Sequence, residues 1–351
     1  MLILGIVTCL AFVLALVATR VAMAIAARLA FLDQVGTEAH KQHVQTVPYG
    51  GGPAMALAMA VALGVGAYSG GFTPIIPQEP VDHGALWPLM TGALAMLVLG
   101  FFDDRKPLPA RFKLMVQVLI CGIIVHFGDL SVDSLRPWQP LAFLAAWGWL
   151  VLISNAFNLL DHADGMAASV AVISCLVLVS GALLNGDLAL ALVFLALIGV
   201  LLGYLVWNFP PAKVYMGDSG SLPLGFLIGC GTLSVTFWPS AASANWLAVL
   251  TPVIITAIPL FDTAAVVVKR WRRGKPLMVG DRNHISHRLN RLGLSSRSTL
   301  AVVVSLQVAL AGSVLQLRGG DLASGILVIL QDAAILLVVV LLETSRDRGP
   351  A

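Results

Sequence analysis

Two adjacent aspartates, Asp103 and Asp104, stand at the end of a long apolar run and are followed by a cluster of basic side chains. Neighbouring carboxylates repel each other unless a cation or a proton offsets their charge. Mg²⁺ usually binds one or two protein carboxylates and leaves its other coordination positions to water and substrate phosphate. The two aspartates beside a cluster of basic side chains therefore predict a site for Mg²⁺ and phosphate oxygens. The plainer alternative is a solvated loop. The basic residues are Arg105, Lys106, Arg111 and Lys113.

Four polar side chains recur at every third position in the segment NAFNLLDHADG. They are Asn155, Asn158, Asp161 and Asp164. On a helix this spacing makes a slowly drifting stripe about 13 Å long. Such groups at the end of a membrane helix are costly without partners. The stripe predicts a polar ligand site, although hydrogen bonds between helices would also satisfy it. His162 lies in the same segment, and a capping or packing role is as plausible for it as a ligand role.

Asp218 stands between two glycines in the segment YMGDSGS, directly before a new apolar run. This position suits a helix N-cap, and it equally suits a carboxylate and backbone N–H groups that face a metal-bound phosphate. Both readings stay open on the sequence alone. Pro210 and Pro211 end the preceding apolar run, so Asn208 is expected on irregular backbone, which membrane proteins tolerate only where it is buried or lines a wet cavity.

His284 and His287 are three residues apart, about one helical turn, and charged residues surround them. The spacing could place both imidazoles on one cationic face of a helix. A zinc site would need a third ligand nearby, and none is obvious. Binding of phosphate is therefore the favoured prediction for this segment. The surrounding charged residues are Asp281, Arg282 and Arg288.

The apolar runs between these polar segments decide the class of protein. Hydrophobic residues make up 58% of the chain and charged residues 11%, with a mean hydropathy of +0.91. A soluble protein of this size needs about a quarter of its residues charged. We therefore expect an all-α polytopic membrane protein, because the runs are too long for a closed β-barrel. No P-loop, GxGxxG or GxSxG motif stands at a strand-to-helix junction, so soluble kinases, Rossmann enzymes and hydrolases are not indicated.

At about 20 apolar residues per helix, the sequence predicts about eleven membrane spans. They are expected at 2–27, 53–70, 85–102, 112–128, 141–158, 166–184, 188–207, 220–238, 246–268, 299–317 and 322–342. The first is expected to be a retained helix rather than a cleaved signal peptide. We expect one integral membrane domain over residues 1–351, with a loop at 269–298 that carries the histidine motif.

The basic residues indicate which side of the membrane holds the polar segments. Loops after odd-numbered spans carry most of the lysine and arginine, whereas loops after even-numbered spans carry only Arg136 and Arg318. The positive-inside rule therefore places the odd-numbered ends in the cytoplasm and the N-terminus outside. Every polar segment described above follows an odd-numbered span. The sequence thus predicts a site that faces the cytoplasm.

In their order along the chain, these segments resemble the polyprenyl-phosphate N-acetylhexosamine-1-phosphate transferase superfamily, which includes the MraY and WecA types. The resemblance runs from about residue 33 to residue 294. The family motif NAxNLxDGxDG is met by NAFNLLDHADG and FMGDxGS by YMGDSGS, and the segment DRN at 281–283 and the expected span count resemble the WecA type more than the MraY type. The motif GxxDD…KLxxQ is met by Gly100, Asp103, Asp104, Lys113, Leu114 and Gln117.

The resemblance implies transfer of an N-acetylhexosamine 1-phosphate from a UDP-sugar to polyprenyl (undecaprenyl) phosphate, with release of UMP. The product is a polyprenyl-diphosphate-linked sugar that initiates synthesis of a cell-envelope glycan. Mg²⁺ is the implied cofactor, with Mn²⁺ as an alternative. The implied location is the bacterial inner (plasma) membrane, with the active site on the cytoplasmic face. The implied partners are the UDP-sugar, the lipid phosphate and the membrane, without nucleic acid, and a homodimer is left open.

The family's roles transfer to this chain position by position. Asp218 resembles the metal ligand. The implied catalytic set is Asp103, Asp104, Lys113, His284 and His287, of which the last three match phosphate contacts. The implied substrate-binding set is Lys41, His43, Asn155, Asn158, Asp161, Asp164, Asn208, Tyr215 and Arg288, with Asn208, Asp164 and Tyr215 as uridine contacts. Three positions depart from the pattern: His40 replaces an arginine, His162 a glycine and Ser286 a histidine of the WecA-type cluster.

Several alternatives remain at this stage. A phospho-MurNAc-pentapeptide transferase of the MraY type would use another UDP-sugar, and a catalytically silent relative would keep the motifs without turnover. A secondary transporter would also carry intramembrane acids and broken helices, although it should show polar groups at mid-membrane and an internal repeat. For the transferase, direct in-line attack by the lipid phosphate is the hypothesis, and an aspartyl-phosphate intermediate is the rival route.

Overall fold

The protein folds into helices in the computed structural model, which describes residues 2–29, 31, 47–70, 86–128, 130, 132, 135, 137–235, 246–274, 284–319 and 321–346. Two compact units are present, Met1–Thr236 and Phe237–Ala351, and each is described by itself. Within the described ranges the only pairing of β type is an isolated bridge between Tyr49 and Tyr215. The expectation of one membrane domain over residues 1–351 stays a prediction.

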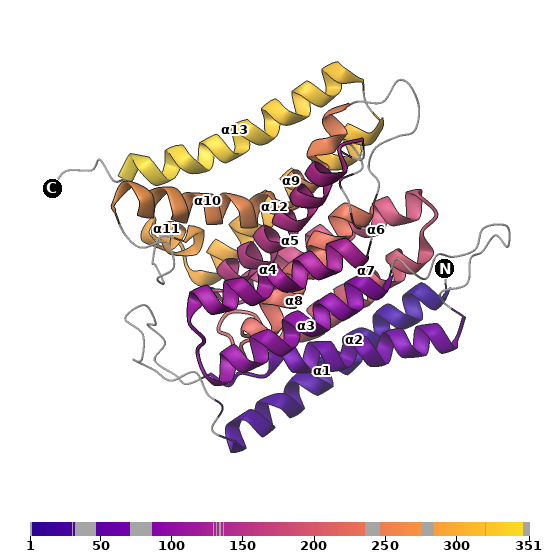
Figure 1. The fold of residues 1–351 in the computed structure, drawn as a ribbon. Helices are drawn as coiled ribbons and strands as arrows, with labels where there is room; N and C mark the ends of the chain where they lie inside the picture. Colours follow the sequence, from indigo (N-terminus) through magenta and orange to yellow (C-terminus); the bar gives the residue numbers. More distant parts are fainter. Residues whose placement is uncertain are drawn as a thin grey trace. The chain divides into compact units, whose positions relative to one another are not determined.

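The first unit contains eight helices in its described part (Figure 1). They are α1 (Leu2–Arg28), α2 (Gly51–Tyr68), α3 (Leu86–Arg105), α4 (Ala110–Phe127), α5 (Gln139–Leu160), α6 (Met166–Leu184), α7 (Leu188–Asn208) and α8 (Asp218–Ser234). The second unit contains a short 3₁₀ helix and five α-helices in its described part. They are η3 (Trp246–Leu250), α9 (Thr251–Ile255), α10 (Ala257–Arg272), α11 (Ile285–Arg291), α12 (Ser296–Gly319) and α13 (Leu322–Arg346).

Nine helices of the described chain are long and apolar enough to cross a membrane, which confirms the prediction of an all-α polytopic membrane protein. The pair Leu247–Ile255 and Ala257–Arg272 is bent by 75°, and as one broken span it would bring the number to ten. The predicted eighth span corresponds to α8, whose 17 residues rise only about 26 Å against a bilayer core of about 30 Å. The count of eleven is therefore not confirmed.

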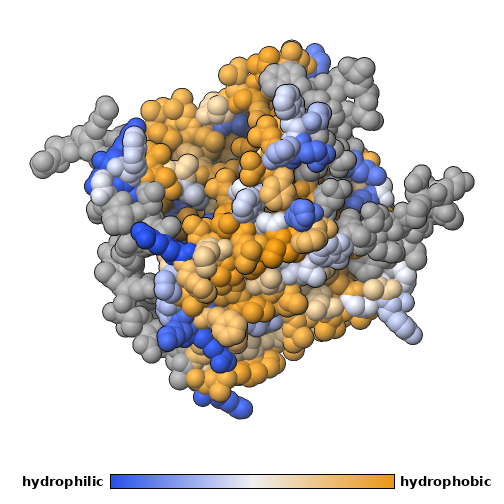
Figure 2. Space-filling view, viewed as in Figure 1, coloured by the Kyte–Doolittle hydropathy of each residue, from blue (hydrophilic) through white to orange (hydrophobic). Residues whose placement is uncertain are grey.

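Helix α7 lies at the centre of the first unit and packs against α1, α2 and α6. Gly199 and Gly203 of α7 face α1, and a Cβ at either position would overlap a backbone oxygen of that helix. Small residues four apart allow helix backbones to approach closely, which stabilises helix pairs in lipid. The other side of α1 exposes Ile6, Val13 and Val17. Figure 2 shows hydrophobic residues, in orange, over much of the coloured surface, as a lipid-facing exterior requires.

Helix α8 packs against α3 and α5, and this packing brings three polar helix ends together. A Cβ at Gly100 of α3 would overlap the backbone of Asp218 and Ser219 at the start of α8. A Cβ at Gly225 would crowd the α5 backbone, 2.7 Å from the carbonyl oxygen of Ile153. The two glycines therefore allow α8 to lie directly on its neighbours.

Candidate active site

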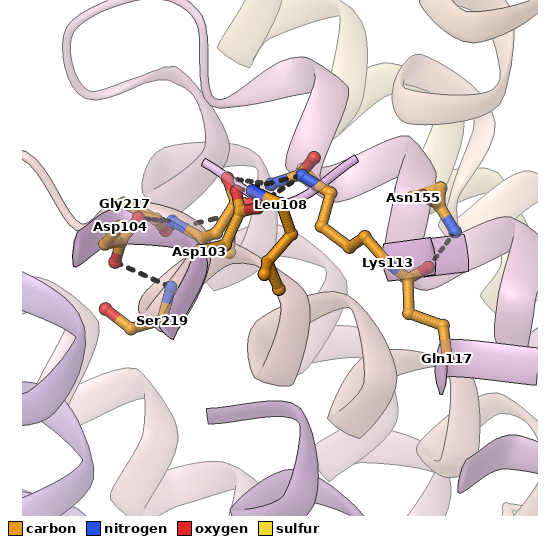
Figure 3. A network of polar contacts seen from close by, with 11 residues as sticks. Asp103, Asp104, Leu108, Lys113, Gln117, Asn155, Gly217 and Ser219 are labelled. Atoms are coloured by element: carbon orange, nitrogen blue, oxygen red, sulfur yellow. Dashed lines mark hydrogen bonds and ion pairs between the residues drawn. The ribbon is translucent and has the colours of Figure 1, made fainter. Parts of the chain in front are cut away.

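Asp104 binds the start of α8 with both oxygens of its carboxylate. The backbone N–H of Asp218 donates to Oδ1 at 2.7 Å, and the backbone N–H of Ser219 donates to Oδ2 at 3.0 Å. Helix N-termini leave several N–H groups without intrahelical partners, and a carboxylate there is favoured by the helix dipole. Gly217, at φ +66°, precedes this helix, and a Cβ on it would lie 2.5 Å from Asp104 Oδ2. Asp104 thus caps α8 from another helix (Figure 3).

Asp103 and Asp218 are joined by one lysine. The ammonium of Lys113, in the first turn of α4, donates to Asp103 Oδ2 at 3.2 Å and to Asp218 Oδ2 at 2.5 Å. The second oxygen of Asp103 accepts the backbone N–H of Leu108, in the connection between α3 and α4. The Asp103 side chain is 15% exposed, and those of Lys113 and Asp218 are each 21% exposed. Two carboxylate oxygens therefore converge on a single cation in a partly enclosed position.

Two asparagines from α5 complete this polar network. The Asn158 side-chain amide donates to Asp218 Oδ1 at 2.8 Å and to the hydroxyl of Ser221 at 2.9 Å. One turn earlier, Asn155 donates to the side-chain oxygen of Gln117 at 2.5 Å. Asn158 thus binds the oxygen of Asp218 that Lys113 does not bind. Part of the predicted stripe is satisfied between helices, as the plainer reading of its spacing allowed.

The network carries a strong excess of negative charge. It contains three carboxylates and one ammonium group: Asp103 and Asp218 pair with Lys113, Asp104 caps α8, and Asp161 follows at the C-terminal end of α5. Burial raises the pKa of Asp161 well above its ordinary value, and the negative charges of Asp218, Asp104 and other acids raise it further. Hard oxygen ligands and excess negative charge are what Mg²⁺ or Mn²⁺ requires. The donor set of Asp103 and Asp218 therefore fits a divalent cation.

A second set of predicted residues holds the loop between α7 and α8. Asn208 accepts the backbone N–H of Gly165 at 2.8 Å and donates to the carbonyl of Val214 at 2.8 Å. Asp164 accepts the backbone N–H of Ala212 at 2.9 Å. Both side chains thus connect the turn after α5 to the loop before α8. In this structure Asn208 and Asp164, two of the three predicted uridine contacts, bind backbone groups.

Tyr215 lies where the segment before α2 meets the same loop. Its backbone N–H donates to the carbonyl of Pro48 at 3.0 Å, and its carbonyl accepts the N–H of Gly51 at 3.0 Å. The ring centroids of Tyr49 and Tyr215 are 6.2 Å apart. This contact anchors residues 47–50, directly before α2, beside the loop that leads to Asp218. Lys41 and His43 lie outside the described residues.

His162, in the turn after α5, donates from Nδ1 to the carbonyl of Leu159 at 2.8 Å. The carbonyl belongs to the last turn of the helix, where such groups lack intrahelical partners. This contact matches the capping role that was one of the two open readings of His162. Its role toward a ligand stays a prediction.

In the second unit, the histidine motif is held by an aspartate. Asp262 of α10 accepts hydrogen bonds from the His284 side chain, the Ile285 backbone and the Arg288 side chain. His284 is the N-cap residue of α11 with extended backbone, so the helical spacing does not determine the direction of its side chain. Asp281 and Arg282 lie outside the described residues. The predicted phosphate-binding segment is therefore an organised structure built on α10.

Sequence reasoning identified the members of the first network but not Asp262. The packing of the first unit brings Asp103, Asp104, Lys113, Asn158 and Asp218 together from four helices. Asp262 is a single acid within the apolar run AIPLFDTAAVVV, and it is 1% exposed. Ionisable residues inside such runs are costly and functional by default. That signal could have identified Asp262, although nothing in the spacing indicates its partner.

Comparison with known proteins agrees with this geometry. Residues 86–236, which run from α3 to the end of the first unit, match the model of the family described as glycosyl transferase family 4. A probable undecaprenyl-phosphate N-acetylglucosaminyl 1-phosphate transferase from Bacillus subtilis is 32% identical over 82% of this chain and 77% of its own length. The chain belongs to glycosyl transferase family 4.

Two further relatives are similar over most of the chain. A decaprenyl-phosphate N-acetylglucosaminephosphotransferase from Mycolicibacterium smegmatis is 28% identical over 88% of this chain and 80% of its own length. An undecaprenyl-phosphate alpha-N-acetylglucosaminyl 1-phosphate transferase from Escherichia coli K12 is 28% identical over 72% of this chain and 70% of its own length. The family 4 match includes the whole network from Asp103 to Asp218, and the histidine motif lies beyond it.

Proposed function

We propose that this protein transfers N-acetylglucosamine 1-phosphate from UDP-N-acetylglucosamine to undecaprenyl phosphate, releasing UMP and starting a lipid-linked cell-envelope glycan. The observation that carries the proposal is the convergence of Asp103 and Asp218 on Lys113, with Asp104 capping the helix that begins at Asp218. The names of the relatives above give a polyprenyl phosphate and the transfer of an N-acetylglucosamine phosphate group. Family membership and this network favour a transferase over a secondary transporter.

The reaction needs charge neutralisation and positioning more than it needs a strong base. A phosphate monoester has a second pKa near 6, so the lipid phosphate is largely dianionic at neutral pH. In phosphoryl transfer, in-line alignment and stabilisation of the equatorial oxygens provide most of the catalysis. Asp218 would hold Mg²⁺, which would supply positive charge to stabilise the negative charge on the phosphate oxygens. Mn²⁺ has the same preference for oxygen ligands and is expected to substitute for it.

The contacts suggest a division of roles among the acids. Asp218, whose oxygens face Lys113 and Asn158, is the proposed metal ligand. Asp103 shares Lys113 and is the proposed acceptor of any residual proton from the lipid phosphate. Both Asp104 oxygens accept backbone N–H groups, so its proposed role is to hold Asp218 in place rather than to act as a nucleophile. Lys113 supplies positive charge for phosphate oxygens once substrate arrives.

The proposed location is the inner membrane of a bacterium, with the catalytic network at its cytoplasmic surface. The lysine and arginine distribution supports this orientation, because basic residues gather in the loops that hold the polar segments. UDP-sugars are soluble cytoplasmic molecules and the acceptor is a membrane lipid. An active site at this interface would meet both substrates, with the polyprenyl chain lying along apolar helix surfaces.

The decisive experiment measures UMP release by purified protein with undecaprenyl phosphate, Mg²⁺ and a panel of UDP-sugars. We expect turnover with UDP-N-acetylglucosamine and none without divalent metal. Turnover with UDP-MurNAc-pentapeptide alone would replace the proposal by a transferase of the MraY type. No turnover with any donor in the panel would indicate a silent relative.

The metal role of Asp218 has its own test. Asp218→Asn keeps an oxygen for Asn158 but removes a negative charge, so we expect turnover to fall by at least about 100-fold, the scale of losing one charge-stabilising group. Asp187→Asn is the matched control, because Asp187 caps α7 through Leu190 N–H and asparagine caps helices equally well. Full activity of the folded Asp218→Asn protein would remove the metal assignment.

The chemical route is tested separately with donor labelled by ³²P at the β-phosphorus. Direct attack by the lipid phosphate predicts no labelled protein when acceptor is absent. Label retained on the denatured enzyme would instead support an aspartyl-phosphate intermediate. In that case Asp103→Asn should abolish the label.

A further inference from the structure

Asp262 gathers three donors from one short segment. Its Oδ2 accepts Nδ1–H of His284 at 2.7 Å, while its Oδ1 accepts the backbone N–H of Ile285 at 2.6 Å and Nη2–H of Arg288 at 3.2 Å. A carboxylate only accepts hydrogen bonds, so the imidazole proton in this contact is on Nδ1. Asp262 lies in α10 and is 1% exposed. The acid is therefore buried with strong, charge-assisted partners.

Such an arrangement fixes the position of the whole motif. A buried carboxylate is costly unless it is paired, and removing one partner of such a group is strongly destabilising. The three donors are a side chain, a backbone group and a second side chain one turn later. Together they set both the place and the orientation of the first turn of α11 against α10. The guanidinium of Arg288 also lies 5.6 Å from the ring centroid of Phe261, the neighbour of Asp262.

The two histidines of the motif differ in their surroundings. His284 and Arg288 are 5% and 4% exposed and both bind Asp262. His287 lies between these two anchors in the chain and is half-buried, so its imidazole is more accessible than that of His284. A side chain that must meet a phosphate from solution needs such access, whereas a side chain that organises a loop does not.

We propose that Asp262 is a positioning residue of the transferase, which fixes the segment from His284 to Arg288 so that His287 is presented to a phosphate group of the substrate. His284 then acts through Asp262 and is a second positioning residue. This inference rests on the proposed function. It changes the expectation from the sequence, in which His284 and His287 contacted phosphate as equals.

The discriminating variants exploit the geometry of the His284 contact. Asn places an amide N–H two bonds beyond Cβ, as far along the side chain as Nδ1 of histidine, so His284→Asn can still donate to Asp262. We expect it to keep kcat/KM within about threefold of the wild type, since the hydrogen bond persists. His284→Ala should lose about 100-fold, the effect of a displacement near 1 Å at a reacting centre. His287→Asn should also lose about 100-fold, while its unfolding temperature stays close to that of the wild type.

Asp262→Asn and Asp332→Asn form a matched pair within the second unit. Asp332 of α13 is a buried acid that accepts the Ser313 hydroxyl at 2.9 Å. Asp262→Asn replaces one carboxylate oxygen by an amide NH₂ group. This group donates hydrogen bonds and therefore cannot accept Nδ1–H of His284. We therefore expect faster hydrogen exchange in the segment 285–291 and lower kcat for Asp262→Asn, and neither effect for Asp332→Asn.

Two results would overturn the inference. One is a folded His284→Asn protein as inactive as His284→Ala, which would mean that His284 itself touches substrate. The other is unchanged exchange of the segment 285–291 in Asp262→Asn. A wild-type protein that releases no UMP would instead refute the proposed function and, with it, the substrate contact of His287. Hydrogen exchange would still decide the positioning role, so the two failures are distinguishable.

Discussion

Replacing Asp104 with alanine tests whether this acid supports the start of α8 or takes part in the reaction. The change removes two hydrogen bonds, to Asp218 N–H at 2.7 Å and to Ser219 N–H at 3.0 Å. Hydrogen bonds to charged groups contribute about 1.5–3 kcal/mol each, and loss of a helix cap costs about 1 kcal/mol. Since water can reach part of this site, we expect a loss of about 2–4 kcal/mol in the free energy of unfolding.

The assay is reversible unfolding in mixed detergent, followed by tryptophan fluorescence, together with UMP release. Asp104→Asn retains one acceptor oxygen and should lose about half as much stability, about 1–2 kcal/mol. Asp187→Ala is the control, because Asp187 caps α7 through a single bond to Leu190 N–H at 2.9 Å. It should cost about 1 kcal/mol without affecting turnover.

Activity and stability together decide the role of Asp104. If it positions Asp218, the alanine variant should need a higher Mg²⁺ concentration for half-maximal activity and should have an unstable start of α8. An Asp104→Ala protein as stable as the wild type, yet inactive, would refute the capping argument. That outcome would favour direct participation of Asp104 in the reaction.

Two further predictions concern close packing and charge. Gly100→Ala places a methyl group against the backbone of Asp218, so it should cost about 1–3 kcal/mol through overpacking and abolish UMP release, whereas Gly148→Ala, with open space around it, should be neutral in both assays. The pKa of Asp161 is raised above its ordinary value in the folded protein. Ionisation of Asp161 therefore opposes folding once the pH exceeds the pKa of this group in the unfolded chain. Without divalent metal, Asp161→Asn should therefore raise the unfolding temperature at pH 8 and leave it nearly unchanged at pH 4, and an equal shift at both values would contradict the burial argument.

The membrane class and the chemistry-bearing residues followed from the sequence alone. Lipid leaves no partner for an unpaired backbone group, so long apolar runs must become helices whatever their neighbours are. The spacing of the motifs likewise indicated Asp103, Lys113 and Asp218 as candidate site residues. The sequence did not determine where each helix ends. Helix α8 ends at Ser234, although its apolar run continues beyond that residue. The reason is that hydropathy measures the length of a run, whereas local hydrogen bonds decide where a helix ends.

The partners of each polar group were decided only by tertiary structure. Asp103 and Asp104 are adjacent and chemically identical, yet one shares Lys113 and the other caps α8, because successive helical residues point about 100° apart. His284 and Asp262 are 22 residues apart in the chain, yet the packing within the second unit places them in a hydrogen bond. A sequence specifies which side chains can donate or accept, but the approach of separate helices selects the pairs. That selection assigned capping to Asp104 and anchoring to Asp262.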